Sequence, residues 1–304
     1  MGLRLSYRES RDRTLTTPNR RALGRKAAKN APALRLSAFL TEAPAHPETA
    51  DHLTGIASWG LWGNDRFGTC GPVSFYNYLK MITYFLTGIE AQPTIEDVFG
   101  LYTLCNPDFD PKTGAGDGGV DMQTMLELAR KHDVLGNGKM VAFARVDLTN
   151  LDEVHAAISI FGGVLLGVTL DSAQDGQTDS GLWDYVRRSP VWGGHAVLAG
   201  MYDSDMEDHH SDIEIITWAL RVGTTNAFQV HQLDEAWVVI LREHLDHPEF
   251  QKGVDAAAMA AAYETITGDP FPVPLPVPGS LPEGGFHRFL AWLSALWADI
   301  RRRF

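Results

Sequence analysis

The spacing of the hydrophobic residues changes near residue 162, and this change limits the folds that the chain can adopt. Before that point, apolar residues recur every three or four positions, as they do on one face of a helix. After it, they form short runs rich in β-branched residues, separated by turn-forming segments. Helices followed by strands predict an α+β fold rather than a doubly wound parallel sheet.

The same spacing predicts where the individual elements lie. Helices are expected at 70–86, after Thr94, after Asp121 and after Asn150, because each of the last three starts with a residue that caps helix N-termini. Strands are expected at 164–170, 196–200, 213–218 and 237–241, with one more helix at 256–266.

The N-terminal segment differs in charge from the rest of the chain. Residues 1–45 are expected to form a basic arm, because residues 1–35 carry ten Lys or Arg and two acids within a chain of net charge -12. The remaining acidic body would repel a phosphate backbone, so nucleic-acid binding is expected nowhere except in the arm. The other interpretation is that residues 1–35 neutralise or dock on an acidic surface.

The C-terminal segment has its own composition. Residues 269–285 are rich in proline and predict an extended linker after a domain spanning 46–268. Residues 286–304 place large apolar side chains at helical spacing and end in three arginines, which predicts an amphipathic docking helix. The apolar face of this helix is expected to dock on the body of the chain, on a protein partner or second copy, or, least favoured, on a membrane.

Composition excludes several classes of protein. No apolar run approaches the roughly 18 residues of a membrane span. The Arg-rich N-terminus lacks the apolar core of a secretory signal, so we expect no secretion through a signal peptide. Two cysteines in 304 residues indicate a reducing compartment such as the cytoplasm.

One loop gathers acidic residues and histidines, and it is the one candidate for a metal site. Its spacing matches no EF-hand, and a solvated acidic turn accounts for it. No phosphate-cradling motif is present either, so neither a metal nor another cofactor is expected. The residues of this loop are Asp203, Asp205, Asp208, His209, His210 and Asp212.

Cys70 is the first candidate for catalysis. It stands at the start of a strongly patterned helix, after glycine-containing sequence and two residues before Pro72. The N–H groups at a helix N-terminus stabilise an anion, so a thiol there is expected to lose its proton more easily. A buried structural cysteine is the alternative, and packing is the expectation for Cys105.

A thiolate nucleophile needs an imidazole that accepts and returns protons. His195 has the most distinctive setting of the eleven histidines, because it follows Gly193-Gly194 and opens an apolar strand. A ring placed there would face a cleft while the strand fixes its backbone. The alternative is a histidine that only packs at the edge of the core.

Several motifs, in this order, resemble the papain-like cysteine peptidases. They are Gly68-Thr69-Cys70 opening a helix, Gly118-Gly119 before a helix, Gly194-His195-Ala196-Val197, and Thr217-Trp218 on a following strand. The resemblance covers roughly residues 59–245. Asn64-Asp65 and Asp234-Glu235-Ala236-Trp237 look like a branch of this family found in bacteria and their phages.

The resemblance implies a two-lobed fold with a catalytic cleft. A helical lobe at about 59–145 would carry Cys70 as the nucleophile, and an antiparallel β lobe at about 146–250 would carry His195 as the base. Asn64 would stand where the family has a glutamine that helps to form the oxyanion hole, since asparagine donates the same bond from a shorter arm.

The resemblance also implies how a peptide substrate would bind. Gly118 and Gly119 resemble the strip that pairs with the substrate backbone, and Gly194 indicates an open pocket wall. Trp218 resembles the indole that shields the catalytic pair from water.

One position departs from the family pattern. The family's asparagine that orients the imidazole falls on Ile216, which accepts no hydrogen bond. Thr217 is a possible orienter, but strand alternation would point it away from its neighbours. The sequence therefore leaves two functions open. One is a cysteine peptidase or related thiol acyl hydrolase acting on a peptide or protein. The other is an impaired module within a larger assembly such as a phage particle, which would make the chain virion-associated.

Overall fold

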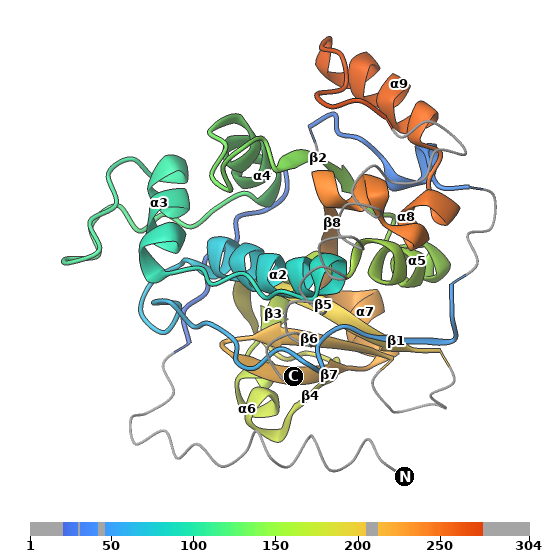
Figure 1. Cartoon of the computed structure of the whole chain (residues 1–304). Coiled ribbons are helices and arrows are strands. Elements are labelled where there is room, and N and C mark those ends of the chain that lie inside the picture. The colour runs from blue at the N-terminus through green and yellow to red at the C-terminus, as the bar shows by residue number, and fades with distance from the viewer. Residues whose placement is uncertain (1–20, 30, 42–45, 205–211, 276–304) are drawn as a thin grey trace, which may run out of the picture.

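A computed structural model describes residues 21–29, 31–41, 46–204 and 212–275 (Figure 1). Three helices form one side of the molecule, with α2 lying across the sheet and α3 and α4 beside it (Figure 1). They are α2 (Cys70–Thr87), α3 (Ile95–Cys105) and α4 (Met122–Lys131). The expected C-terminal docking helix at 286–304 and most of the proline-rich linker lie outside the described residues.

The other side of the molecule is an eight-stranded sheet. Its order is β2-β8-β3-β5-β6-β7-β4, with β1 paired to β5, and every pairing is antiparallel except that of β4 with β7. The strands are β1 (Thr49–Asp51), β2 (Met140–Arg145), β3 (Val164–Asp171), β4 (Leu182–Trp183), β5 (Val191–Asp203), β6 (Ile213–Thr217), β7 (Leu220–Thr224) and β8 (Leu233–Leu241).

Further short helices follow within and after the sheet. Helix α5 packs against the sheet and α8 (Figure 1). These helices are α5 (Leu151–Phe161), α6 (Ala173–Ser180), α7 (Asn226–Gln232), α8 (Pro248–Gly253) and α9 (Ala256–Thr267), with 3₁₀ turns at Leu36–Ala38 and Arg242–Asp246.

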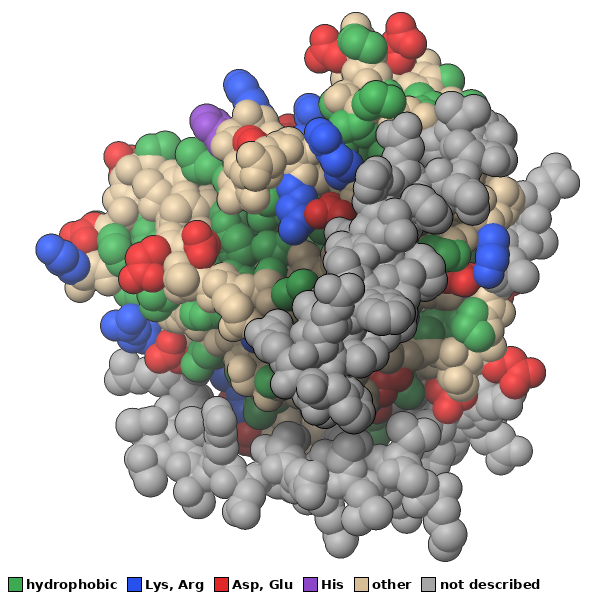
Figure 2. All heavy atoms as spheres, in the orientation of Figure 1, with side chains coloured by type: hydrophobic (Ala, Val, Ile, Leu, Met, Phe, Trp, Pro, Cys, Tyr) green, Lys and Arg blue, Asp and Glu red, His purple; other side chains and the backbone are tan. Residues whose placement is uncertain are grey.

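The sheet is buried on both faces, because successive side chains of its central strands enter two different hydrophobic cores. On β5, Ala196 and Leu198 pack with the helical side, whereas Val197 and Ala199 pack with the α5 side. The predicted α+β class is therefore confirmed, with helices packed on a mainly antiparallel sheet. On the molecular face in Figure 2, acidic and basic side chains are interspersed.

The expected helix starts are largely correct. Thr94 and Asp97 form a reciprocal capping box at α3, and the Asp121 carboxylate accepts a hydrogen bond from Thr124 N at α4. Asn150 precedes α5 without a side-chain cap bond.

Two expected boundaries are wrong. Residues 34–39 are not part of a solvated arm, because Leu34, Leu36 and Phe39 are buried in the core shared with α5. Strand β2 falls within the range expected for the helical lobe, yet it pairs with β8 at the edge of the sheet. Both segments join the body through long-range backbone pairing that local spacing does not reveal.

A histidine in this fold makes stability depend on pH. Burial lowers the pKa of His244 to about 4, and its Nδ1 accepts a hydrogen bond from Leu241 N at 2.9 Å. Below the unfolded value of 6.5 the unfolded chain binds a proton that the folded chain excludes, so this contribution to stability is lost as pH falls toward 4.

We expect His244→Gln to flatten the dependence of unfolding free energy on pH by about 1.4 kcal/mol per pH unit between pH 6 and 4.5. Urea denaturation across this range measures the slope. His132→Gln at an exposed site is the matched control and should leave the slope unchanged. Equal slopes for wild type and His244→Gln would show that His244 is protonated in the folded protein.

No helix in the described part of the chain is long and apolar enough to cross a bilayer.

Candidate active site

Cys70 is the first residue of α2, as the sequence predicts, and it is buried. Pro72 lies in the first turn, where its missing N–H costs no helical hydrogen bond. Burial raises the pKa of the Cys70 thiol to about 11, against the opposing effects of the backbone N–H groups of Ala196 and Gly24, the charge of Arg25 and the N–H of Gly71. The expectation of a more acidic thiol is therefore wrong for this structure, because burial excludes water from the sulfur.

His195 lies on β5 and is also buried. Its ring stacks on the indole of Trp218 with centroids 4.2 Å apart and planes 18° apart. Its Nε2 lies 2.8 Å from Thr217 Oγ1, whereas its Nδ1 has no hydrogen-bond partner among the described residues. Burial lowers the pKa of His195 to about 3, helped by the positive charge of Arg25, so the ring is neutral at pH 7.

The fold brings the residue after His195 against Cys70, while no hydrogen bond joins the thiol to the imidazole among the described residues. The residue after His195 is Ala196, and its backbone N–H is one of the donors toward the Cys70 sulfur. Ala196 and Cys70 also belong to the same hydrophobic core. A helix start and a strand 125 residues apart in the sequence therefore meet at the sulfur.

Thr217, not Ile216, is the polar partner of the imidazole. Ile216 packs in the core that also contains Cys70. The β6–β7 turn follows directly, with Trp218 at φ 44° and Ala219 at φ 63°. Alternation along β6 places Thr217 on the face of Ile215, opposite Ile216, and His195 lies on that same face of β5.

Asn64 is buried close to the same site and directs its amide toward carbonyl oxygens. Its Nδ2 donates to Ala22 O and to Phe67 O, both at 3.1 Å. The indole N–H of Trp218 donates to the same Ala22 oxygen at 3.3 Å. The side chain assigned to the oxyanion hole thus contacts a peptide carbonyl here.

That carbonyl belongs to residues 21–26, which we call the cleft segment. Its backbone pairs on both sides, because Arg25 N donates to Gly194 O at 3.0 Å and Val120 N donates to Gly24 O at 2.7 Å. Lys26 N donates to Val120 O at 2.7 Å, which completes a parallel bridge between Arg25 and Val120. The cleft segment therefore lies between the strand that carries His195 and the loop before α4.

The expected backbone-pairing strip is displaced by one residue. Val120 makes the hydrogen bonds to the cleft segment, whereas Gly119 N donates to the hydroxyl of Tyr102 at 2.8 Å. The lack of a side chain at Gly119 lets the cleft segment approach, because a Cβ there would lie 2.2 Å from Gly24 O. Gly118 is exposed beside this contact.

Gly194 gives the cleft segment room on its other side, at strand β5. A Cβ at Gly194 would lie 2.2 Å from Arg25 O, so its lack of a side chain lets the cleft segment approach the strand. The open pocket wall expected at Gly194 stays a prediction.

Two arginines anchor the cleft segment to acidic groups. Arg21 pairs with Asp175 at 2.6 Å and with Asp179, and its guanidinium lies 5.6 Å from the ring centroid of Trp218. Arg25 pairs with Asp234 and, at 2.9 Å, with Glu235. Sequence reasoning noted the excess of basic residues but missed their place in the cleft, since no periodic pattern marks an extended segment of this length.

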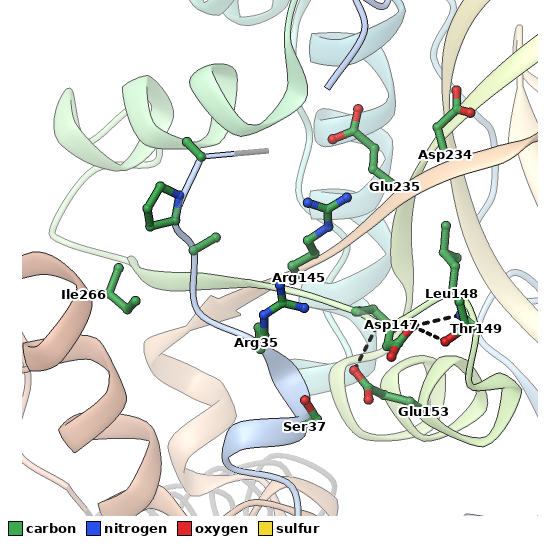
Figure 3. Close-up of a pocket in the computed structure, with 14 residues that line it drawn as sticks. Arg35, Ser37, Arg145, Asp147, Leu148, Thr149, Glu153, Asp234, Glu235 and Ile266 are labelled. Atoms are coloured by element: carbon green, nitrogen blue, oxygen red, sulfur yellow. Dashed lines mark hydrogen bonds between the residues drawn. The ribbon is translucent and has the colours of Figure 1, made fainter. Parts of the chain in front are cut away.

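A cavity of about 670 Å³ lies next to this region rather than at Cys70 (Figure 3). Arg35 and Arg145 lie side by side in Figure 3, with Asp234 and Glu235 on another side of the space. In the described ranges no group of three or more His, Cys, Asp or Glu residues is placed to hold a metal ion. Most of the acidic loop between Asp203 and Asp212 lies outside those ranges.

No protein-family model and no curated protein matches this chain. Solved structures do: xylellain, a cysteine protease from Xylella fastidiosa, gives a TM-score of 0.55 at 13% identity, over 75% of this chain and 98% of the other. Procathepsin B S9 from Trypanosoma congolense gives 0.51 at 11% identity, over 73% of this chain and 87% of the other. The papain-like fold expected from the sequence is thus confirmed, and the bacterial and phage branch stays a prediction.

Proposed function

We propose that this chain is a papain-like cysteine peptidase, or a related thiol acyl hydrolase, in which Cys70 and His195 form the catalytic pair. The observation that carries the proposal is the setting of the imidazole. Its Nε2 contacts Thr217 and its Nδ1 is left without a partner, beside the strand residue that donates to the Cys70 sulfur.

This arrangement fits the transfer of a proton from the thiol. If Nε2 carries the ring proton and donates it to Thr217 Oγ1, Nδ1 holds the lone pair and acts as the base. Nδ1 then takes the thiol proton as the sulfur bonds to the carbonyl carbon of the substrate. Trp218 covers one face of the ring and limits the access of water.

Asn64 and the leaving group complete the reaction. The carbonyl oxygen becomes an oxyanion that accepts hydrogen bonds from Asn64 Nδ2 and from the backbone N–H of Cys70. His195 returns its proton to the departing amine as the carbon–nitrogen bond breaks. The thioester is then cleaved by water, with His195 accepting a proton from that water, and the thiol is regenerated.

The closed cleft segment makes this a latent enzyme in our proposal. Residues 21–26 occupy the groove where a peptide would pair with Gly194 and Val120, and they exclude water from Cys70. A Cβ at Gly24 would lie 2.0 Å from Gly68 O, so Gly24→Val is designed to open the groove.

In the Gly24→Val protein we expect hydrolysis of a fluorogenic peptide library, and Cys70→Ala abolishes it. Thr217→Val should lower kcat/KM about tenfold, because one hydrogen bond that orients the imidazole is lost. Thr217→Ser keeps the hydroxyl and should restore most of the rate. Initial rates measured for the four proteins, each checked for folding by circular dichroism, test the assignment.

The alternative function gives the opposite result. An impaired module of a larger assembly, such as a phage particle, would cleave no peptide after Gly24→Val opens the groove. This alternative is motivated by Ile216 at the orienter position, by the basic arm and by the C-terminal helix; the contact between Thr217 and His195 argues against the first of these. Docking through 286–304, or of residues 1–35 on an acidic partner, stays a prediction.

A further inference from the structure

The side chain of Arg25 fills a pocket beside the candidate catalytic pair. Only 3% of it is exposed, and the chain body contacts its guanidinium on several sides. Nη1 pairs with Glu235 Oε1 at 2.9 Å, Nη2 pairs with Asp234 and lies 3.3 Å from Thr169 Oγ1, and Nε donates to Val168 O at 3.3 Å. The pocket therefore combines two carboxylates with two neutral acceptors.

The pocket is held in shape by contacts that do not involve Arg25. Glu235 Oε2 accepts a hydrogen bond from Trp237 Nε1 at 2.8 Å, and Thr169 Oγ1 donates to Asp234 Oδ2 at 2.7 Å. Gly167 provides the room, because a Cβ there would lie 2.5 Å from Glu235 Cγ and 2.8 Å from Arg25 Cδ. The acceptors would stay aimed into the pocket if Arg25 left it.

If Arg25 left the pocket, the buried carboxylate of Glu235 would lose its partner cation. The side chain of Glu235 has no exposed area, and burial raises its pKa although Arg25 and Trp237 act against the shift. A buried carboxylate without a cation is costly, so after opening of the cleft segment Glu235 would either take up a proton or bind a replacement cation. A planar guanidinium matches the divergent acceptors better than a compact ammonium does.

The pocket also lies within reach of a peptide in the groove. Arg25 enters it from a backbone that pairs with Gly194 and Val120, the two positions expected to border a substrate. In the sheet, Val168 and Thr169 of β3 pair with His195 and Gly194 of β5. Asp234 and Glu235 also line the cavity of Figure 3, so open space adjoins the pocket.

We propose that Asp234, Glu235, Thr169 and Gly167 form a specificity pocket for an arginine side chain of the substrate, and that Arg25 is its tethered competitor. That the bound arginine belongs to a substrate rests on the proposed peptidase function. The pocket itself is tested by binding, which needs no catalysis.

The binding experiment uses the full chain with Cys70→Ala and Arg25→Ala, titrated with N-acetylarginine amide in a calorimeter. N-acetylcitrulline amide, which has nearly the same shape without the charge, is the matched control ligand. We expect the arginine probe to bind at least about tenfold more tightly than the citrulline probe, because charged hydrogen bonds replace those of Arg25. Adding Glu235→Gln should remove most of this difference.

A second measurement covers the case in which Arg25→Ala does not fold. In the wild-type protein, millimolar N-acetylarginine amide should compete with Arg25 and speed alkylation of Cys70, whereas the citrulline probe should not. Equal effects of the two probes in both experiments would overturn the pocket and leave Arg25 as a structural anchor.

Hydrolysis separates the pocket from the catalytic assignment. In the Gly24→Val, Arg25→Ala protein, peptides with arginine should be cleaved with kcat/KM at least about tenfold above their citrulline counterparts. Cleavage without that preference overturns the pocket and keeps the peptidase. Probe binding without any cleavage keeps the pocket and overturns the peptidase.

Discussion

Gly24→Val is expected to increase the rate at which iodoacetamide alkylates Cys70 by about 100-fold at pH 7. The new side chain would collide with Gly68 O, and the loop at Gly68 is held by two hydrogen bonds from its N–H to the Asp117 carboxylate. The cleft segment must therefore move. A return of the Cys70 pKa from about 11 to the ordinary 9.0 accounts for that factor through the thiolate fraction alone.

The second cysteine provides an internal reference for this measurement. Burial raises the pKa of Cys105, at the end of α3, to about 11 as well, although the charge of Lys26 in the cleft segment acts against this rise. Peptide mass spectrometry of one sample therefore reports both rates. The expected result is a selective rise at Cys70.

Gly100→Val is the matched control. Gly100 is exposed on α3, and a Cβ there would meet no atom within 4 Å, so the same substitution disturbs no packing. Its Cys70 rate should equal that of the wild type. A folded Gly24→Val protein whose Cys70 stays as slow as Cys105 would show that the cleft segment does not limit access to the thiol.

The elements with strong periodicity could be predicted from the sequence. The stripe of apolar residues behind Cys70 gives α2, which spans Cys70–Thr87 against an expected 70–86. The short β-branched runs give the centres of β3, β5, β6 and β8. The helix is marked by a one-sided apolar spacing and the strands by continuous apolar runs that suit a sheet buried on both faces, so the sequence carries the information without knowledge of long-range partners.

The contacts that close the site could not be predicted in the same way. The cleft segment has no apolar period, and its place depends on Arg21 and Arg25 meeting carboxylates more than 150 positions later in the chain. Thr217, a possible orienter from the sequence, contacts His195, but local spacing could not show that the imidazole lies on the face opposite Ile216. Both features are set by tertiary pairing.

Asn64→Ala is expected to have two effects of opposite sign. In the Gly24→Val background, kcat should fall about 10²–10³-fold with little change in KM, because a donor to the oxyanion is lost. With Gly24 intact, alkylation of Cys70 should instead rise, since Ala22 O loses the hydrogen bond that Asn64 Nδ2 donates. One substitution would thus make the thiol easier to reach and the enzyme slower.

Asn64→Gln distinguishes this role from a purely structural one. Asn64 Nδ2 also donates to Phe67 O, so removal of the amide weakens the loop before Cys70 as well. Glutamine keeps an amide donor on a longer side chain and should retain most of kcat, while thermal unfolding reports any loss of stability in each variant. If alanine and glutamine lower kcat equally at equal stability, the amide does not reach the oxyanion. If neither lowers it, the oxyanion is stabilised by backbone N–H groups alone.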